Sequence, residues 1–542
     1  MIAYFGFAQY VRATSSLVQG AHLFSPVCSY QKNICLYNIS LFKSLLTTTQ
    51  SNASDSTPFK SLAFFPWTHN SYHTLWNGHH NLSQEDWSVM INEFSDAIAV
   101  GSDYNVYVFF MRQSKNPISY KVPFSDHDIK ALSTDCIRVA WTLDPGDPLE
   151  PLLLFSHLNL LYIYNVKKQG VQGYLRGHGG AITSIVVHPI NTNLFCTTSR
   201  DYSTRIYDLL LKPQKLEDLG NPHWPPGTKK SFAGAAHGLH MTEPEGEGNG
   251  IGRCIIILMG GRSGGHQAAV LSAAFNPDFP VIATCGLDRL VKIWHVPRAS
   301  KETLIREDKP LFSSGRIHKA RVLSISWLQN DLLLSHSAPA VMKRTSGSTE
   351  SRKMWLEPGQ IVIWLWLSLN RFFPAKHSGV RQDILRGCAS DYQESNSLIP
   401  VYVYQGSFKT ISAISFPSAQ TQFDTPALHL YQSPTHDPVV SFTYPKFNSI
   451  KLFNVIHLHP RKPPPFPFDV LNMEIGEHLN ENGERGIRSQ TDIPPEVSGW
   501  EISPVAGTVG EEILACAMGM EGTTLIGVGS KEGKGIIWIW KL

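Results

Sequence analysis

The sequence has few cysteines for its length, and none of them is arranged as a close pair. Its 542 residues include eight cysteines, and no two of them form a Cys-x-x-Cys motif. This spacing offers neither a disulfide framework nor a set of zinc ligands, and several cysteines lie in apolar, strand-like runs. We therefore expect reduced cysteines in the interior of an intracellular protein.

Long apolar runs are also missing. No stretch of about 20 apolar residues occurs, so we expect no membrane-spanning helix. The N-terminus has no basic region followed by an apolar core, so we expect no secretory signal. Residues 47–57 are rich in Ser, Thr and Asn and are typical of a linker. We predict that residues 1–60 form a poorly ordered segment outside a folded unit that spans residues 62–542.

Charge and chemically reactive motifs are equally scarce. Charged residues make up 17% of the chain and the net charge is +3, which gives no strong basic field for direct binding to DNA. No His-Glu-x-x-His motif, Cys/His cluster, catalytic triad or carboxylate pair occurs at an interpretable spacing. We predict no catalytic residue, no metal and no cofactor.

Turn-forming residues are abundant, with 41 glycines and 35 prolines. A cluster of glycines at residues 248–261 lacks the Lys-Ser/Thr of a phosphate-binding loop and the strand–helix context of a dinucleotide site. We predict a flexible hinge there. The abundance of turn residues elsewhere is typical of an all-β protein with many short strands.

Residues 176–208, RGHGGAITSIVVHPINTNLFCTTSRDYSTRIYD, show how those strands are organised. A Gly-His pair precedes one apolar run, a Ser-x-Asp turn follows a second, and an aromatic-Asp pair ends the third. This is the pattern of one blade of a β-propeller. A histidine, a turn aspartate, a hydroxyl and a strand-end aromatic can form a buried polar network. We predict those four roles for His178, Asp201, Ser199 and Tyr207.

The pattern recurs along the chain. In residues 264–296 His266, Asp288 and Trp294 fill the roles, while Gly286 replaces the hydroxyl residue and leaves the network one member short. His318 and Trp364 open and close another repeat. One blade cannot bury both of its faces, so several must stack. We predict an all-β, seven-bladed propeller with blades at about 90–113, 136–167, 178–212, 266–300, 318–368, 408–459 and 498–542. Long loop insertions are expected at about 211–260, 338–358 and 461–497. The final strand, IIWIWKL, suits closure of the ring against an N-terminal strand.

Several of these repeats resemble those of one known family. The turn Cys-Gly-x-Asp at residues 285–288 is unusual, because most propeller blades have Ser where Gly286 lies. With GHGGAITSIVVHPINTNLF, IHKARVLSISWLQNDLLLS and VAWTLDPGDPLEPLLLF, it is similar to the WD40 repeats of the Polycomb protein EED, or extra sex combs, family. The three insertions have no counterpart that we can place, and they are either lineage-specific loops or errors of the gene model. The same choice, between a genuine segment and an error of the gene model, stays open for residues 1–60.

The resemblance implies a non-catalytic nuclear subunit of Polycomb repressive complex 2. Such a subunit supports gene repression by holding the enhancer-of-zeste histone methyltransferase on one face, within a hetero-oligomeric complex. On the other face, members of the family bind a histone tail carrying trimethyl-lysine in an aromatic cage, since aromatic faces attract quaternary ammonium ions.

Only part of that cage is visible in the sequence. Trp76 and Trp87 are candidates for its first wall, but Ile137 lies at the second position and Ser412-Ala413 at the third. A propeller that kept the adaptor role with an altered reader pocket fits as well. Two other classes stay open: a WD40 scaffold in another complex, such as a ubiquitin-ligase substrate adaptor or an RNA-processing factor, and an enzyme built on a propeller.

Overall fold

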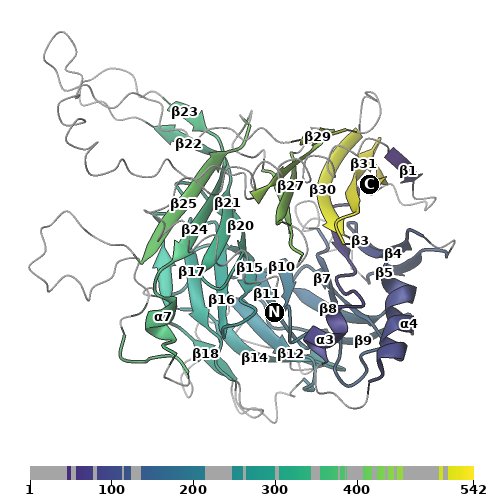
Figure 1. Ribbon diagram of the computed structural model, residues 1–542, viewed down its shortest axis with the longest axis horizontal. Coiled ribbons are helices and arrows are strands. Elements are labelled where there is room, and N and C mark those ends of the chain that lie inside the picture. Colours follow the sequence, from purple (N-terminus) through teal and green to yellow (C-terminus); the bar gives the residue numbers. More distant parts are fainter. Residues whose placement is uncertain are drawn as a thin grey trace, which may run out of the picture.

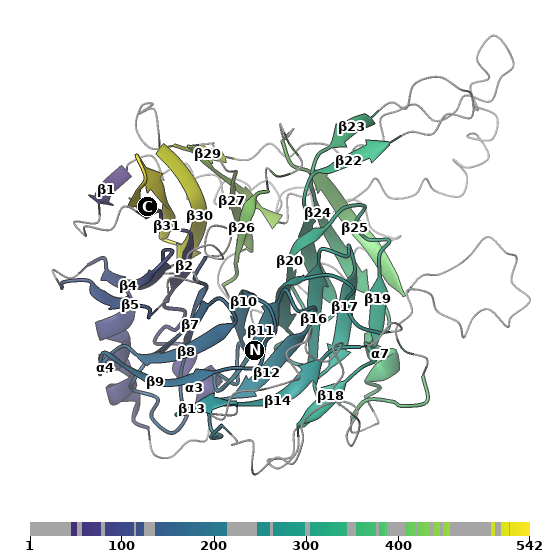
Figure 2. The same ribbon diagram turned by 180° about the vertical axis from the view of Figure 1, so that it is seen from behind.

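The computed structural model describes residues 45–50, 57–76, 82–112, 115–123, 136–213, 247–260, 264–298, 304–343, 354–375, 379–384, 386, 407–417, 421, 423, 425–433, 437–444, 448–455, 500–503, 511–519 and 521–541. Seven sheets of four or five strands follow one another around a ring (Figure 1). The expected β-propeller is therefore confirmed. A separate two-stranded ribbon projects from the ring, as the view from behind also shows (Figure 2).

Each blade is a sheet whose strands lie side by side in order from the centre of the ring to its rim, and all neighbours are antiparallel apart from one parallel pair at the rim of blade 3. Blades 1 to 3 consist of β2 (Ser61–Phe64), β3 (Ala97–Gly101), β4 (Asn105–Phe110) and β5 (Ile118–Lys121); β6 (Val139–Thr142), β7 (Leu152–His157), β8 (Leu160–Asn165), β9 (Gly170–Leu175) and β13 (Gly248–Asn249); and β10 (Ile182–Val187), β11 (Leu194–Ser199), β12 (Thr204–Asp208), β14 (Arg253–Leu258) and β18 (Ile305–Glu307).

Blades 4 to 7 follow the same plan. They consist of β15 (Val270–Phe275), β16 (Val281–Gly286), β17 (Val291–His295) and β19 (Phe312–Ser314); β20 (Val322–Trp327), β21 (Leu332–Ser337), β24 (Gln360–Trp366) and β25 (Phe408–Ser415); β26 (Ala427–Tyr431), β27 (Val439–Thr443), β28 (Ile450–Asn454) and β29 (Trp500–Ile502); and β30 (Glu511–Gly519), β31 (Thr524–Lys531), β32 (Lys534–Lys541) and β1 (Leu45–Gln50).

The inner strands share a local irregularity. In blades 3, 4, 5 and 7 the pairing register shifts at the start of the inner strand, as between Ile182 and Ser184 in β10 and between Val270 and Ser272 in β15. A bulge of this kind increases the local twist of the strand. Strongly twisted inner strands allow the blades to approach one another closely around the axis.

The ring closes through the N-terminal strand. β1 pairs antiparallel with β32, so that Thr48 lies opposite Trp538 and Gln50 opposite Ile536. The predicted closure against an N-terminal strand is therefore present. The expectation that residues 1–60 lie outside the folded unit was wrong for this part, because a strand from this region covers the outer edge of blade 7 and Phe59 is buried.

A helical insertion separates the first two strands of blade 1. It contains α3 (Ser71–Leu75) and α4 (Gln84–Phe94). The side chain of Ser83 caps α4 by accepting a hydrogen bond from the backbone N–H of Asp86 at 3.0 Å. The face of α4 that carries Trp87 and Phe94 is buried in the core shared by blades 1 and 2. The inner strand of blade 1 therefore lies at residues 61–64, well before the predicted start at residue 90.

The outer strands of the later blades also differ from the prediction. Thr410 and its neighbours, expected in the sixth blade, lie in β25 and pair with β24 as the rim of blade 5. β29, expected in the seventh blade, pairs with β28 as the rim of blade 6. In both cases a long insertion separates the outer strand from the rest of its sheet in the sequence.

The glycine cluster is a tight crossing between blades and not a flexible hinge. Gly248 and Asn249 pair with β9, and the chain then enters β14 of the next blade. Gly250 has a φ of +87°, and a Cβ at this position would lie 1.9 Å from the carbonyl oxygen of Gln172. Only glycine adopts this φ without strain and also leaves room for the carbonyl oxygen.

Candidate functional site

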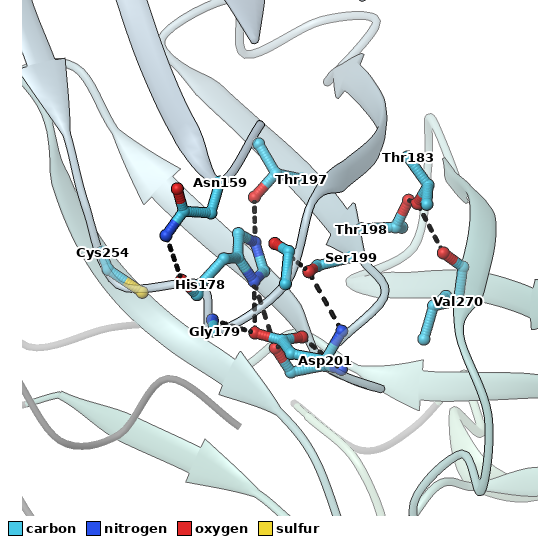
Figure 3. Close-up of polar contacts among 12 residues, drawn as sticks. Asn159, His178, Gly179, Thr183, Thr197, Thr198, Ser199, Asp201, Cys254 and Val270 are labelled. Atoms are coloured by element: carbon cyan, nitrogen blue, oxygen red, sulfur yellow. Dashed lines mark hydrogen bonds and ion pairs between the residues drawn. The ribbon is translucent and has the colours of Figure 1, made fainter. Parts of the chain in front are cut away.

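The polar network of blade 3 is buried at the end of the sheet where β11 turns into β12 (Figure 3). Nδ1 of His178 lies 2.9 Å from Oδ2 of Asp201, and Nε2 lies 2.7 Å from Oγ1 of Thr197. The backbone N–H of Gly179 donates to the same carboxylate oxygen at 2.9 Å. Since Asp201 accepts, Nδ1 of His178 is the donor and Nε2 accepts from Thr197.

The hydroxyl of the network comes from an unexpected residue. Ser199, which the sequence predicted for this role, donates to the carbonyl oxygen of Gly180 at 2.7 Å and accepts from the N–H of Asp201 at 3.2 Å. Thr197 lies two residues earlier on β11, on the same face of the strand as Ser199. Its hydroxyl bonds the histidine instead. Tyr207 stacks on Phe195, with ring centroids 5.0 Å apart.

Blade 4 has the same network, and it is complete. Nδ1 of His266 lies 2.9 Å from Oδ2 of Asp288, and Nε2 lies 2.9 Å from Oγ1 of Thr284. The indole of Trp294 donates to that hydroxyl at 2.9 Å. The prediction that Gly286 leaves this network one member short was therefore wrong, because Thr284 supplies the hydroxyl. A Cβ on Gly286 would lie 2.4 Å from the carbonyl oxygen of Ala269, so close packing accounts for this glycine.

Blade 5 retains three of the four members. Nε2 of His318 lies 2.7 Å from Oγ of Ser335, and Trp364 donates to the same hydroxyl at 3.0 Å. Nδ1 of His318 is buried and, among the described residues, has no hydrogen-bond partner. The chain leaves β21 into the projecting ribbon, where blades 3 and 4 have their turn aspartates.

These networks are held in one protonation state. Burial lowers the pKa of His178 and of His266, although an aspartate opposes it in each case. Burial lowers the pKa of His318 to about 3. Burial alone would raise the pKa of Asp201, but His178 and Arg205 lower it well below its usual range. Neutral imidazoles and an ionised aspartate are suited to a permanent structural role, since none of them titrates near neutral pH.

The two tryptophans considered for an aromatic cage lie inside the helical insertion. Trp76 follows α3 and is 4% exposed, and Trp87 in α4 is 0% exposed. Their rings lie 6.1 Å apart in an edge-to-face arrangement, and the indole of Trp87 donates to the carbonyl oxygen of Thr68 at 3.2 Å. Neither ring has a face open to a ligand.

The other two cage positions carry no aromatic ring. Ile137 is 2% exposed, and its carbonyl oxygen accepts a hydrogen bond from Oγ of Ser61 at 2.5 Å. Ser412 and Ala413 lie in β25 at the rim of blade 5. The inner strand of the sixth blade is β26, so Ser412 and Ala413 do not lie in the blade in which that residue pair was expected.

Three kinds of feature are absent from the described part of the chain. The described part of the chain contains no group of three or more His, Cys, Asp or Glu side chains that could hold a metal ion. Of its helices, none has the length and apolar character needed to span a membrane. Its cysteines at 196, 254, 285 and 516 are buried and form no disulfide.

The fold and the repeated His–Asp–hydroxyl networks define a WD40-type β-propeller. In agreement, the family model described as WD domain, G-beta repeat matches residues 170–208 and 253–295.

More specific similarity is to Polycomb proteins. The chain is 28% identical over 158 residues to Polycomb group protein FIE1 of Zea mays and 26% identical over 213 residues to Polycomb protein EED of Chaetomium thermophilum. These matches cover 29% and 38% of this chain. They cover 25% and 31% of the relatives, so the chain spans less than a third of their length.

A solved structure shows the same fold over a much longer stretch. A chain in the crystal structure of the Chaetomium thermophilum polycomb repressive complex 2 superimposes with a TM-score of 0.55 at 16% identity. The superposition covers 92% of the present chain and 97% of the other. The blades that the local sequence matches leave out therefore adopt the same architecture.

Proposed function

We propose that this protein is a non-catalytic chromatin adaptor, a subunit of a Polycomb repressive complex 2-like histone methyltransferase. It binds an enhancer-of-zeste-type catalytic subunit in a hetero-oligomeric nuclear complex and supports gene repression. A WD40 fold alone is common to many complexes and does not choose among them. The choice depends on the sequence similarity to curated Polycomb proteins.

The observation that supports the proposal most directly is the turn of blade 4. Its Cys-Gly-Leu-Asp sequence is the motif by which this blade resembles the Polycomb family. Gly286 is required by the carbonyl of Ala269, and Asp288 holds His266. The departure from the usual Ser is thus built into the packing of the blade.

Support for a non-catalytic role comes from how the reactive side chains are used. Two histidine–aspartate pairs could in principle act as an acid and a base, but in both the side chains are bonded to each other and buried: His178 with Asp201, and His266 with Asp288. A catalytic acid or base must reach a substrate, and these do not.

Co-purification tests the adaptor role. The full chain, tagged, is co-expressed with the enhancer-of-zeste-type subunit of its own organism, and an unrelated seven-bladed propeller serves as the control. We expect a stable complex on size exclusion and a methyltransferase activity that depends on the propeller. No co-elution would remove the Polycomb assignment and favour a scaffold in another complex. Substrate turnover by the purified chain alone would overturn the non-catalytic role.

Binding to a histone tail carrying trimethyl-lysine stays a separate prediction. The buried positions of Trp76 and Trp87, and the aliphatic Ile137, give it no support. Titration of the purified protein with trimethylated and unmodified histone-tail peptides tests it. Equal affinity for both peptides would remove the reader role and leave the adaptor role standing.

A further inference from the structure

The ribbon that projects from blade 5 is a two-stranded sheet without a core of its own. β22 (Ala340–Lys343) and β23 (Met354–Glu357) pair antiparallel between the second and third strands of the blade. Within the described residues no third strand pairs with either of them. The outer edge of each strand therefore presents backbone groups that a further strand could bond.

Both faces of the β22–β23 ribbon are apolar. Val341 lies opposite Leu356 on one face, and Met342 lies opposite Trp355 on the other. Met354 is 64% exposed, Trp355 42% and Val341 42%. Isolated hairpins are marginally stable in water, and a ribbon of a folded domain normally buries one of its faces. Single exposed apolar side chains need no explanation, but several on one small ribbon mark an interaction site.

The surface beside the ribbon is positively charged. Arg289, in the turn between β16 and β17, and Arg316, before β20, are both exposed. Their loops touch, because a Cβ on Gly315 would lie 3.1 Å from the side chain of Leu290. Nζ of Lys319 lies 2.9 Å from Oε1 of Glu357 in β23 and joins this loop to the root of the ribbon.

We propose that the β22–β23 ribbon and the neighbouring cations form a docking surface for an acidic segment of a partner protein. The segment adds as an extended strand to the open edge of the ribbon. Its apolar side chains, which all lie on one side of the strand, cover the face that carries Val341 and Met354, and its carboxylates, on the other side, face Arg289 and Arg316. Charge complementarity selects an acidic partner, since the described anions at this place, Glu357 and Asp288, are already bonded to Lys319 and His266. This surface does not depend on the proposed Polycomb role.

A defined peptide probes the surface directly. A fluorescein-labelled peptide of about ten residues, alternating Val or Leu with Glu or Asp, is titrated with the full-length protein and followed by fluorescence anisotropy. Three comparison probes are a peptide with Lys in place of the acidic residues, a peptide with Ser in place of the apolar ones, and a single-stranded oligonucleotide.

The variants separate the two parts of the surface. Replacement of the exposed pair on one face, Val341→Ser with Met354→Ser, is expected to weaken binding of the acidic peptide by about tenfold or more. Charge reversal, Arg289→Glu with Arg316→Glu, is expected to weaken it severalfold and to remove most of its salt dependence. Val89→Ser, on the exposed face of α4, is the matched control and should bind as the unaltered protein does.

Each other outcome overturns the proposal. Absence of acidic-peptide binding at high micromolar protein does so, as does equal binding of the basic peptide. Binding that the ribbon variant leaves unchanged places the peptide elsewhere. Preferential binding of the oligonucleotide, lost in the charge-reversal variant, would make the surface a nucleic-acid site instead.

Discussion

The indole Nε1 of Trp327 donates a hydrogen bond to the carbonyl oxygen of Ala274 at 2.9 Å and so joins the inner strands of blades 5 and 4. Trp141 makes the same bond to Ala63 at 3.0 Å between blades 2 and 1. Each indole lies opposite a leucine of the second strand, Leu333 or Leu153. The two residues are therefore equivalent, and both hold a blade to the one before it.

The substitution Trp327→Phe should loosen this contact. It keeps an aromatic ring but removes the donor, and so deletes the hydrogen bond to the carbonyl of Ala274, at an expected cost of about 0.5–1.5 kcal/mol in the free energy of unfolding. The comparison is Trp366→Phe, because the buried Nε1 of Trp366 has no partner among the described residues. Urea unfolding measures both, and equal losses would mean that the hydrogen bond contributes nothing.

Removal of a network histidine should lower the free energy of unfolding more in a blade where an aspartate bonds that histidine than in a blade without one. His266→Phe removes the imidazole N–H from the carboxylate of Asp288, whose side chain is 7% exposed, and should destabilise the protein by about 1.5–3 kcal/mol. His318→Phe leaves no carboxylate behind and should cost less. Thermal unfolding of the two variants tests the order. If His318→Phe is the more damaging of the two, the His–Asp pair does not stabilise blade 4 in this way.

Buried histidines should make the fold sensitive to mild acid. Burial lowers the pKa of His318 to about 3 and the pKa values of His336 and His429 to about 4. The unfolded chain takes up these protons near pH 6.5, before the folded protein does. The stability that these neutral histidines contribute is therefore fully present above about pH 6.5. It is lost as the pH falls towards about 4, by about 1.4 kcal/mol per pH unit for each histidine.

The variant His336→Gln checks this dependence. It should reduce the slope of unfolding free energy against pH by about one proton between pH 6 and 4.5. Val89→Ser, which removes no titratable group from an exposed position, is the control and should leave the slope as it is. A slope that His336→Gln does not change would show that this histidine is not the group that titrates.

The glycine crossing between blades 2 and 3 can be tested with a matched pair of alanines. Gly250 and Gly533 have φ values of +87° and +82°, so alanine strains the backbone equally at both. Only at Gly250 does a Cβ meet backbone, whereas nothing lies within 4 Å of one at Gly533. Gly533→Ala should cost about 1 kcal/mol and Gly250→Ala clearly more. Similar unfolding midpoints for the two variants would contradict a tight crossing.

The sequence patterns correctly predicted those features of the blades that depend on residues close together in the sequence. The blade containing His178 and Asp201 and the blade containing His266 and Asp288 were recognisable because their members lie within one short repeat. The hydroxyl was misplaced because Thr197 and Ser199 lie two residues apart on the same face of one strand, and only the three-dimensional structure shows which of them reaches the histidine.

Features that depend on distant residues could not be read in this way. β25 lies beyond a long insertion, so nothing near residue 408 indicates that its partner is β24. The same holds for β1 and β32, which lie near opposite ends of the chain. Trp76 and Trp87 were considered for a cage because exposed and buried tryptophans look alike in a sequence, and the helices that bury them are defined only by their packing.

The pairing of β1 with β32 has a consequence for how the protein is made. β1 precedes every other described strand in the sequence, and its partner β32 follows them all, so β32 is synthesised only after the other six blades. Throughout translation the early strand has no native neighbour, and every incomplete chain has an uncovered edge that can pair wrongly. Contacts between such distant residues also form slowly. A premature stop anywhere before β32 therefore yields a ring that cannot close, and degradation or chaperone binding of such fragments is the expected fate.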